Sequence, residues 1–238
     1  MVPAWNSRAN PSRQRNPQGY LAGQEGIGEL VNPYYSEAGI QIFHGDCREI
    51  LPQLGRFDLL LTDPPYGVNA DRDRNSQKNG WVDYGSTGWD KEPVTKVHLD
   101  ICRASSEKAV IWGGNYFELP PSMGWLVWNK GQRAFSLADG ELAWTSERKA
   151  MRIFDYSRGE ALQDGKQHPT QKPIALMKWC ITQMGVVCSL VDAFMGSGTS
   201  LVAAKDLGIL ATGIELEERY CEIAANRLRQ SVLNFEVA

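Results

Sequence analysis

The residues with the clearest chemistry are Asp63-Pro64-Pro65-Tyr66, which end an apolar run at residues 57–62. Proline has no N–H to donate to a sheet ladder, so the proline pair predicts that a buried strand stops here and the chain leaves the sheet. In an open α/β sheet, ligands bind at the carboxyl ends of the strands. The sequence therefore predicts a carboxylate, two carbonyl groups and an aromatic ring at a ligand-binding edge.

This set of groups is suited to an exocyclic amine on a nucleic-acid base. The lone pair of such an amine is delocalised into the ring, which makes the nitrogen a poor nucleophile. The Asp63 carboxylate and the Pro64 carbonyl can accept its two hydrogens and favour a pyramidal nitrogen, while Tyr66 stacks on the base. The alternative is an ordinary strand-end turn, in which Asp63 caps a helix and Tyr66 is a core residue.

A second motif combines a strand, a glycine turn and a helix. Residues 189–192 form an apolar run ending in Asp192, and Phe194-Met195-Gly196-Ser197-Gly198 follows. Thr199 or Ser200 can start the next helix, and the glycines let a ligand lie against the backbone at its N-terminus. A phosphate loop is the competing interpretation, but the Gly-Lys-Ser/Thr signature is absent from this stretch.

The apolar run at residues 210–215 predicts a further strand, and it ends in Glu215. In dinucleotide-type sites an acidic residue at the end of such a strand binds ribose hydroxyls. Glu215 is therefore a candidate for contact with a nucleoside.

Together these motifs resemble those of the amino-methylating DNA methyltransferases, which use S-adenosylmethionine. Residues 63–66 are similar to the catalytic motif of that family, and residues 194–198 to its cofactor motif. His168-Pro169-Thr170-Gln171-Lys172-Pro173 matches the segment that precedes the cofactor motif. The motif order is that of the β group.

The resemblance implies a Rossmann-like α/β methyltransferase fold, with a mostly parallel central sheet, helices on both faces and an antiparallel strand pair. It implies direct in-line transfer of a methyl group to the amine of a base flipped out of double-stranded DNA. Because aspartate opens the catalytic motif, adenine N6 is the expected target. Cytosine N4, an RNA adenine and a non-catalytic DNA-binding role are the alternatives.

The resemblance also implies a set of site residues. Asp63, Pro64, Pro65 and Tyr66 are the expected catalytic residues. The expected cofactor-binding residues are Asp46, Thr170, Lys172, Asp192, Phe194, Gly196, Ser197, Gly198, Thr199 and Glu215. Asp46 is expected near the adenine of the cofactor and is also a good helix N-cap. The methionine end is assigned to Thr170 and Lys172, and the amino-acid moiety to Asp192.

Length and composition predict one α/β domain at residues 31–238, preceded by a flexible extension at residues 1–30. Residues 67–93 are expected to form a loop at the catalytic site, and residues 131–167 a short target-recognition region in which strands at 141–145 and 151–155 pair with each other. Five cysteines without a Cys-x-x-C spacing predict neither a disulfide framework nor a metal site.

The net charge of −3 argues weakly against a dedicated nucleic-acid coat protein, although an acidic enzyme can still bind DNA on one basic face. The sequence has neither an apolar run long enough for a membrane span nor the apolar core of a signal peptide, so a cytoplasmic location is expected. A homodimer and a restriction partner are left open.

Overall fold

The computed structural model describes residues 31–67, 94–133, 138–163 and 171–230. The extension predicted at residues 1–30 and nearly all of the loop predicted at residues 67–93 lie outside these ranges. In the described part of the chain, no helix is long and apolar enough to cross a membrane.

The described chain forms one nine-stranded sheet in the order β1-β2-β9-β8-β3-β4-β6-β5-β7. Strands β2, β9, β8, β3 and β4 are parallel neighbours. At one edge β1 pairs antiparallel with β2. Towards the other edge β6 runs antiparallel between β4 and β5, and β7 is parallel to β5. The strands are β1 Tyr35–Glu37, β2 Ile40–His44, β3 Phe57–Thr62, β4 Ser106–Trp112, β5 Trp125–Asn129, β6 Gly140–Thr145, β7 Arg152–Asp155, β8 Ser189–Asp192 and β9 Leu210–Glu215.

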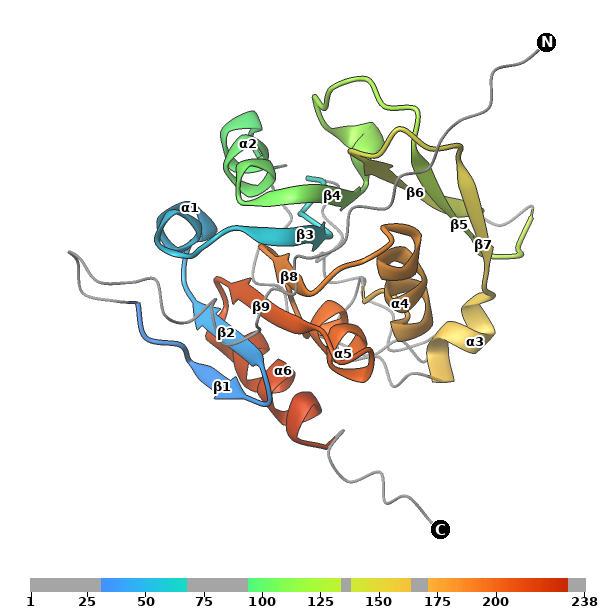
Figure 1. Ribbon diagram of the computed structural model, residues 1–238. Coiled ribbons are helices and arrows are strands. Elements are labelled where there is room, and N and C mark those ends of the chain that lie inside the picture. The colour runs from blue at the N-terminus through green and yellow to red at the C-terminus, as the bar shows by residue number, and fades with distance from the viewer. Residues whose placement is uncertain (1–30, 68–93, 134–137, 164–170, 231–238) are drawn as a thin grey trace, which may run out of the picture. The chain divides into compact units, whose positions relative to one another are not determined.

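Helices cover both faces of the parallel sheet, as Figure 1 shows. Helices α1 and α2 pack on one face, and α4, α5 and α6 on the other. Within β3, Leu59 and Leu61 belong to the core beneath α4–α6, whereas Leu60 belongs to the core beneath α1 and α2. This two-sided burial confirms the predicted Rossmann-like α/β fold. The helices are α1 Cys47–Ile50, α2 Lys96–Ala104, α3 Arg158–Gln163, α4 Ile174–Gln183, α5 Thr199–Asp206 and α6 Glu218–Gln230, with short 3₁₀ turns at Leu51–Gln53 and Gly114–Tyr116.

The two strands predicted within residues 131–167 are present, as β6 and β7, but they are not neighbours. Strand β5 lies between them and bonds to both. The reason is that β6 already pairs with β4 on one side and with β5 on the other, so β7 pairs with the remaining edge of β5. The predicted strand pair was therefore wrong in its partners.

The carboxyl ends of four adjacent parallel strands form a row at one edge of the sheet. Along this row β2 ends at His44, β9 at Glu215, β8 at Asp192 and β3 at Thr62. His44 is in register with Glu215, and Leu60 of β3 is in register with Val191 of β8. Segments that follow these strands therefore meet at the same edge.

Candidate active site at the carboxyl edge of the sheet

Tyr66 packs its ring against the end of β4. The ring stacks on Tyr116 at a centroid distance of 4.9 Å and meets the edge of Phe117 at 6.0 Å. Gly113 has a φ of +67°, and a Cβ added there would lie 2.1 Å from the Tyr66 ring. Only glycine leaves room for this ring. The Tyr66 hydroxyl donates a hydrogen bond to Oδ1 of Asp63.

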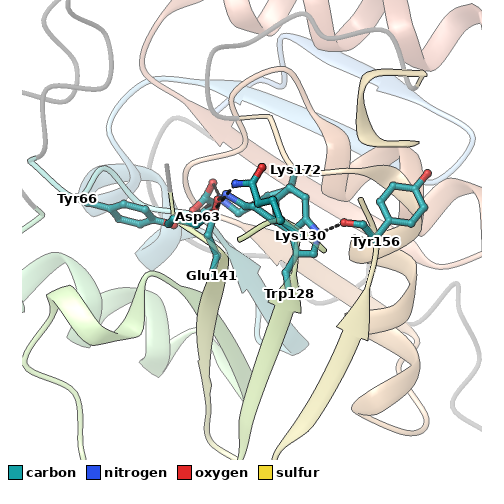
Figure 2. A network of polar contacts seen from close by, with 9 residues as sticks. Asp63, Tyr66, Trp128, Lys130, Glu141, Tyr156 and Lys172 are labelled. Atoms are coloured by element: carbon teal, nitrogen blue, oxygen red, sulfur yellow. Dashed lines mark hydrogen bonds and ion pairs between the residues drawn. The ribbon is translucent and has the colours of Figure 1, made fainter. Parts of the chain in front are cut away.

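The other carboxylate oxygen of Asp63 is bound by Lys172. Lys172 Nζ lies 2.5 Å from Asp63 Oδ2 and 3.0 Å from Glu141 Oε2 on β6, and its side chain is only 3% exposed. Glu141 Oε1 in turn lies 2.5 Å from Lys130 Nζ, which sits over the ring of Trp128 at 4.8 Å. We call Asp63, Lys172, Glu141 and Lys130 the charge cluster (Figure 2). Its carboxylates and ammonium groups alternate.

The pKa values in the charge cluster reflect burial and these ion pairs. Burial lowers the pKa of Lys172, but Asp63 and Glu141 raise it more, so it lies well above its usual range. Burial raises the pKa of Glu141, yet Lys172 and Lys130 outweigh this and hold it at about 2. Burial raises the pKa of Asp63, and the ammonium group of Lys172 opposes that rise. Lys172, together with the hydrogen bond from Tyr66, favours the charged form of Asp63, but burial prevails and the pKa stays above its usual value.

Burial also raises the pKa of Tyr66 well above its usual range, and the neighbouring Asp63 carboxylate adds to the rise. The phenol is therefore protonated at neutral pH and serves as a hydrogen-bond donor to Asp63.

The glycine turn after β8 has the conformation that its sequence predicts. Gly196 and Gly198 have φ values of +51° and +75°, and Gly198 is the N-cap of α5, which begins at Thr199 as expected. A Cβ on Gly198 would lie 2.8 Å from the Cβ of Ala224 on α6. Arg227 of α6 donates to the Ser197 carbonyl at 2.6 Å and to Thr199 Oγ1 at 3.2 Å. Helix α6 thus braces the turn.

Asp192 is enclosed by protein donors. Its Oδ1 accepts hydrogen bonds from Thr62 Oγ1 at 2.7 Å and from the Phe194 backbone N–H at 3.1 Å, and its Oδ2 accepts from Ser200. Burial raises its pKa to about 6. Asp192 therefore joins β8 to β3 and α5, and each of its carboxylate oxygens already has a protein donor.

Glu215 and Asp46 lie further along the same edge. Glu215 accepts hydrogen bonds from the backbone N–H groups of Gly196 and Glu217, each at 2.9 Å, and burial raises its pKa to about 7. Asp46 caps α1 by accepting from the Arg48 N–H at 2.8 Å, and its hydrogen bonds with Arg48 lower its pKa. The predicted capping role of Asp46 is confirmed.

Lys172 was expected among the residues of the cofactor's methionine end, whereas the structure brings it to Asp63. Its neighbour Gln171 accepts a hydrogen bond from Ser197 Oγ at 3.1 Å. Consecutive residues thus bind the catalytic motif and the glycine turn. Phe194 is partly exposed and packs on the core beneath α1 and α2. Thr170 lies outside the described residues.

Two residues of this site were not recognised from the sequence. Glu141 was read only as part of a strand, although a carboxylate in a run that is otherwise mostly apolar is itself a signal of a special environment. Arg227 belongs to none of the motifs, and nothing in its sequence context indicates that it faces the glycine turn.

Three described basic residues between β6 and the glycine turn lie at different places in the structure. Lys172 is buried in the charge cluster, and Lys178 of α4 pairs with Asp206 of α5 at 2.6 Å. Lys149 lines a cavity of about 190 Å³ with residues at the start of β5 and the end of α4. This cavity lies at the edge opposite Asp63, because β5 runs in the same direction as β3.

The chain is similar to several type II methyltransferases. It is 26% identical to M2.DpnII of Streptococcus pneumoniae, over 84% of this chain and 93% of that protein. It is 24% identical to M.ScaI of Streptomyces caespitosus, over 84% of each.

Two solved structures share the fold. The M1.HpyAVI–SAM complex has a TM-score of 0.52 at 23% identity, covering 79% of this chain and 98% of that one. PvuII DNA methyltransferase (cytosine-N4-specific) has a TM-score of 0.54 at 15% identity, covering 87% and 90%. The DNA methylase family profile, which describes N6/N4 methyltransferases, matches residues 104–226, more than half of the chain. The chain belongs to this DNA methylase family of N6/N4 methyltransferases.

Proposed function

We propose that this chain transfers a methyl group from S-adenosylmethionine to N6 of adenine in double-stranded DNA, with the target base flipped out of the duplex. The observation that carries the proposal is the row at the carboxyl edge of the sheet. Asp46, Glu215, the glycine turn and Asp63 lie at the ends of β2, β9, β8 and β3, in that spatial order. This order supports the proposal, because the glycine turn and the Asp63 carboxylate lie at the ends of adjacent strands.

The residues of this row fit the proposed cofactor. The glycine turn keeps the backbone open at the start of α5, since glycine occupies both positions of positive φ. Glu215 is the residue for the ribose hydroxyls and Asp46 for the adenine, with Phe194 packing nearby and Thr170 completing the set. When bound, S-adenosylmethionine supplies a methyl group activated by its positively charged sulfur.

The charge cluster assigns different roles to the two oxygens of Asp63. Lys172 holds Oδ2 at 2.5 Å, while the partner of Oδ1 is the neutral hydroxyl of Tyr66. An incoming base amine replaces that hydroxyl on Oδ1 and donates its second hydrogen to the Pro64 carbonyl. The nitrogen gains positive charge as it attacks, and the Asp63 carboxylate stabilises this charge. The Pro64-Pro65 pair directs the chain out of the sheet after β3 ends at Thr62, and the Tyr66 ring, held against Tyr116 and Gly113, is the proposed stacking partner of the base.

We assign adenine as the target base from the catalytic motif at residues 63–66, because aspartate as the first residue of that motif favours adenine over cytosine. The PvuII enzyme is described as cytosine-N4-specific, but its 15% identity supports only the shared fold.

We assign residues 67–93 to closing over the flipped base and residues 131–167 to target recognition. The likeness to type II methyltransferases supports a place in a restriction-modification system.

The test is nucleoside mass spectrometry on DNA from cells that express this chain, the Asp63→Ala variant or the control Asp100→Ala. Asp100 is an exposed residue of α2 that pairs with Lys96. We expect N6-methyladenine with the wild-type chain and the control but not with Asp63→Ala, which should still bind S-adenosylmethionine in calorimetry. N4-methylcytosine would overturn the assignment of the base. Methylation that survives Asp63→Ala would overturn the catalytic role of Asp63.

A further inference from the structure

We propose that Glu141 is a positioning residue that acts through Lys172: the two hold Oδ2 of Asp63 so that Oδ1 is presented to the substrate amine. This inference rests on the proposed function. Glu141 lies on β6 and makes no described hydrogen bond or ion pair with Asp63, so it acts on Asp63 through the shared ammonium group and through the repulsion between the two carboxylates.

The position of Lys172 is fixed from two sides. Its Nζ lies 2.5 Å from Asp63 Oδ2 and 3.0 Å from Glu141 Oε2, and 3.5 Å from the Tyr66 hydroxyl oxygen. It also lies 5.8 Å and 5.6 Å from the ring centroids of Tyr66 and Trp112. An ammonium group has three donors, and oxygen atoms of three residues surround this one. Only 3% of the Lys172 side chain is exposed, so water can hardly replace these oxygen atoms as hydrogen-bond partners.

The sharing of Lys172 matters for the charge of Asp63. If Asp63 were its only partner, the ammonium group would neutralise the carboxylate and weaken it as an acceptor. Glu141 also attracts the ammonium group of Lys172. The charge of Glu141 is in turn balanced by Lys130, whose Nζ lies 2.5 Å from Glu141 Oε1. The Asp63 carboxylate then keeps negative potential for an amine that becomes positive during the reaction.

The groups that face Asp63 come from several elements. Among the described residues they are Lys172 before α4, Tyr66 on its own segment and Glu141 of β6, with Lys130 of β5 behind Glu141 and Asp192 at the end of β8. Glu141 raises the pKa of Asp63, whereas Lys172 lowers it. Removing each charge should therefore move the pKa of Asp63 in opposite directions, which a purely structural role would not produce.

The first measurement is a titration of the Asp63 carboxyl carbon by NMR in the ¹³C-labelled full chain, with the signal assigned from its loss in Asp63→Asn. Glu141→Gln should lower the pKa of Asp63, and Lys172→Met should raise it. The control is Glu147→Gln, since the Glu147 side chain is 26% exposed like that of Glu141 and pairs with Lys149 instead. This control should leave the Asp63 pKa unchanged. If Lys172→Met fails to fold, Lys172→Arg, which keeps the charge, should retain the wild-type value.

The second measurement is the pH profile of single-turnover methylation of duplex DNA. The acidic limb should shift with the Asp63 pKa, downward for Glu141→Gln and upward for Lys172→Met. At the pH optimum, Glu141→Gln should lower the rate by about ten- to a hundredfold, as for other supporting partners of active-site groups. Glu147→Gln should behave as wild type.

The outcomes separate the two proposals. An Asp63 pKa that does not respond to Glu141→Gln would overturn the inference, whatever the activity. Shifted pKa values with an unchanged rate profile would also overturn it, because the coupling would then not serve the reaction. A wild-type chain that folds but methylates no DNA would instead overturn the proposed function, and the NMR titration would still decide whether Glu141 acts on Asp63.

Discussion

Asp192 is buried and Asp63 is partly buried, and both lie at the ends of neighbouring parallel strands, yet their partners differ. Among the described residues, the hydrogen-bond donors to Asp192 are neutral and lie on β3, α5 and its own turn. Asp63 has the ammonium group of Lys172 on one oxygen and the Tyr66 hydroxyl on the other. Thr62, which directly precedes Asp63, donates a hydrogen bond to Asp192. This bond connects the segment that carries Asp63 to the Asp192 carboxylate.

The difference shows how the same side chain serves two purposes. Burial raises the pKa of both carboxyl groups, but an adjacent cation opposes the rise only at Asp63. The donors to Asp192 belong to strand, turn and helix, and each of its oxygens already accepts a hydrogen bond. At Asp63 the partner of Oδ1 is a single side chain, the Tyr66 hydroxyl. Asp192 thus links three elements of the fold, whereas we propose that Asp63 exchanges its partner on Oδ1 for the substrate amine.

The comparison predicts its largest effect for two matched substitutions. Asp63→Asn should lower the single-turnover methylation rate by about 10³-fold, because one acceptor of the amine becomes a donor. Asp192→Asn should reduce the rate far less but lower the free energy of unfolding by about 1–3 kcal/mol, because its amide nitrogen would face hydrogen-bond donors. Quench-flow assays and urea denaturation measure the two effects.

A double variant sharpens this test. Asp63→Asn leaves the charge cluster with one buried positive charge in excess, which should cost stability. Adding Lys172→Met balances the charges again, so stability should recover while the rate does not. Equal rate losses for Asp63→Asn and Asp192→Asn would contradict the division of roles.

A smaller effect is expected from the glycine under Tyr66. In Gly113→Ala the new Cβ would lie 2.1 Å from the Tyr66 ring and displace it. The base would lose its stacking partner, at about 1–3 kcal/mol, so the rate should fall by about 10- to 100-fold. Gly185→Ala is the control, since Gly185 has a similar φ of +74° and no atom within 4 Å of the added Cβ. Similar rate losses in both variants would indicate backbone strain instead.

Local patterns allowed much of this edge to be predicted. The apolar run at 57–62 is β3, and the glycine turn and the start of α5 lie where the sequence indicates them. A strand and the motif that follows it are continuous in the chain, so their placement needs no knowledge of distant contacts. The fold and the positions of Asp63 and Gly198 could therefore be predicted.

The charge cluster could not be predicted from the sequence, because the order and direction of the strands in the sheet bring its members together. Lys172 and Asp63 are 109 residues apart in the sequence. Glu141 reaches the carboxyl edge only because β6 runs antiparallel, which puts the start of that strand beside the ends of its parallel neighbours. The predicted pairing of β6 with β7 did not contain this information. The enclosure of Asp192 was equally hidden, since a motif does not reveal which donors surround a carboxylate.

The smallest effect concerns the pH dependence of stability at Asp192. Its folded pKa of about 6 lies above the ordinary value of 3.8, so the folded state binds a proton more tightly than the unfolded chain. The stabilisation is complete below pH 4 and is lost as the pH rises through 6. The difference in unfolding free energy between wild type and Asp192→Asn should therefore shrink over this window. Urea denaturation at a series of pH values measures it. A constant difference would mean that the neutral donors hold Asp192 ionised as effectively as a cation would, and the contrast with Asp63 would then lie in access to the ligand alone.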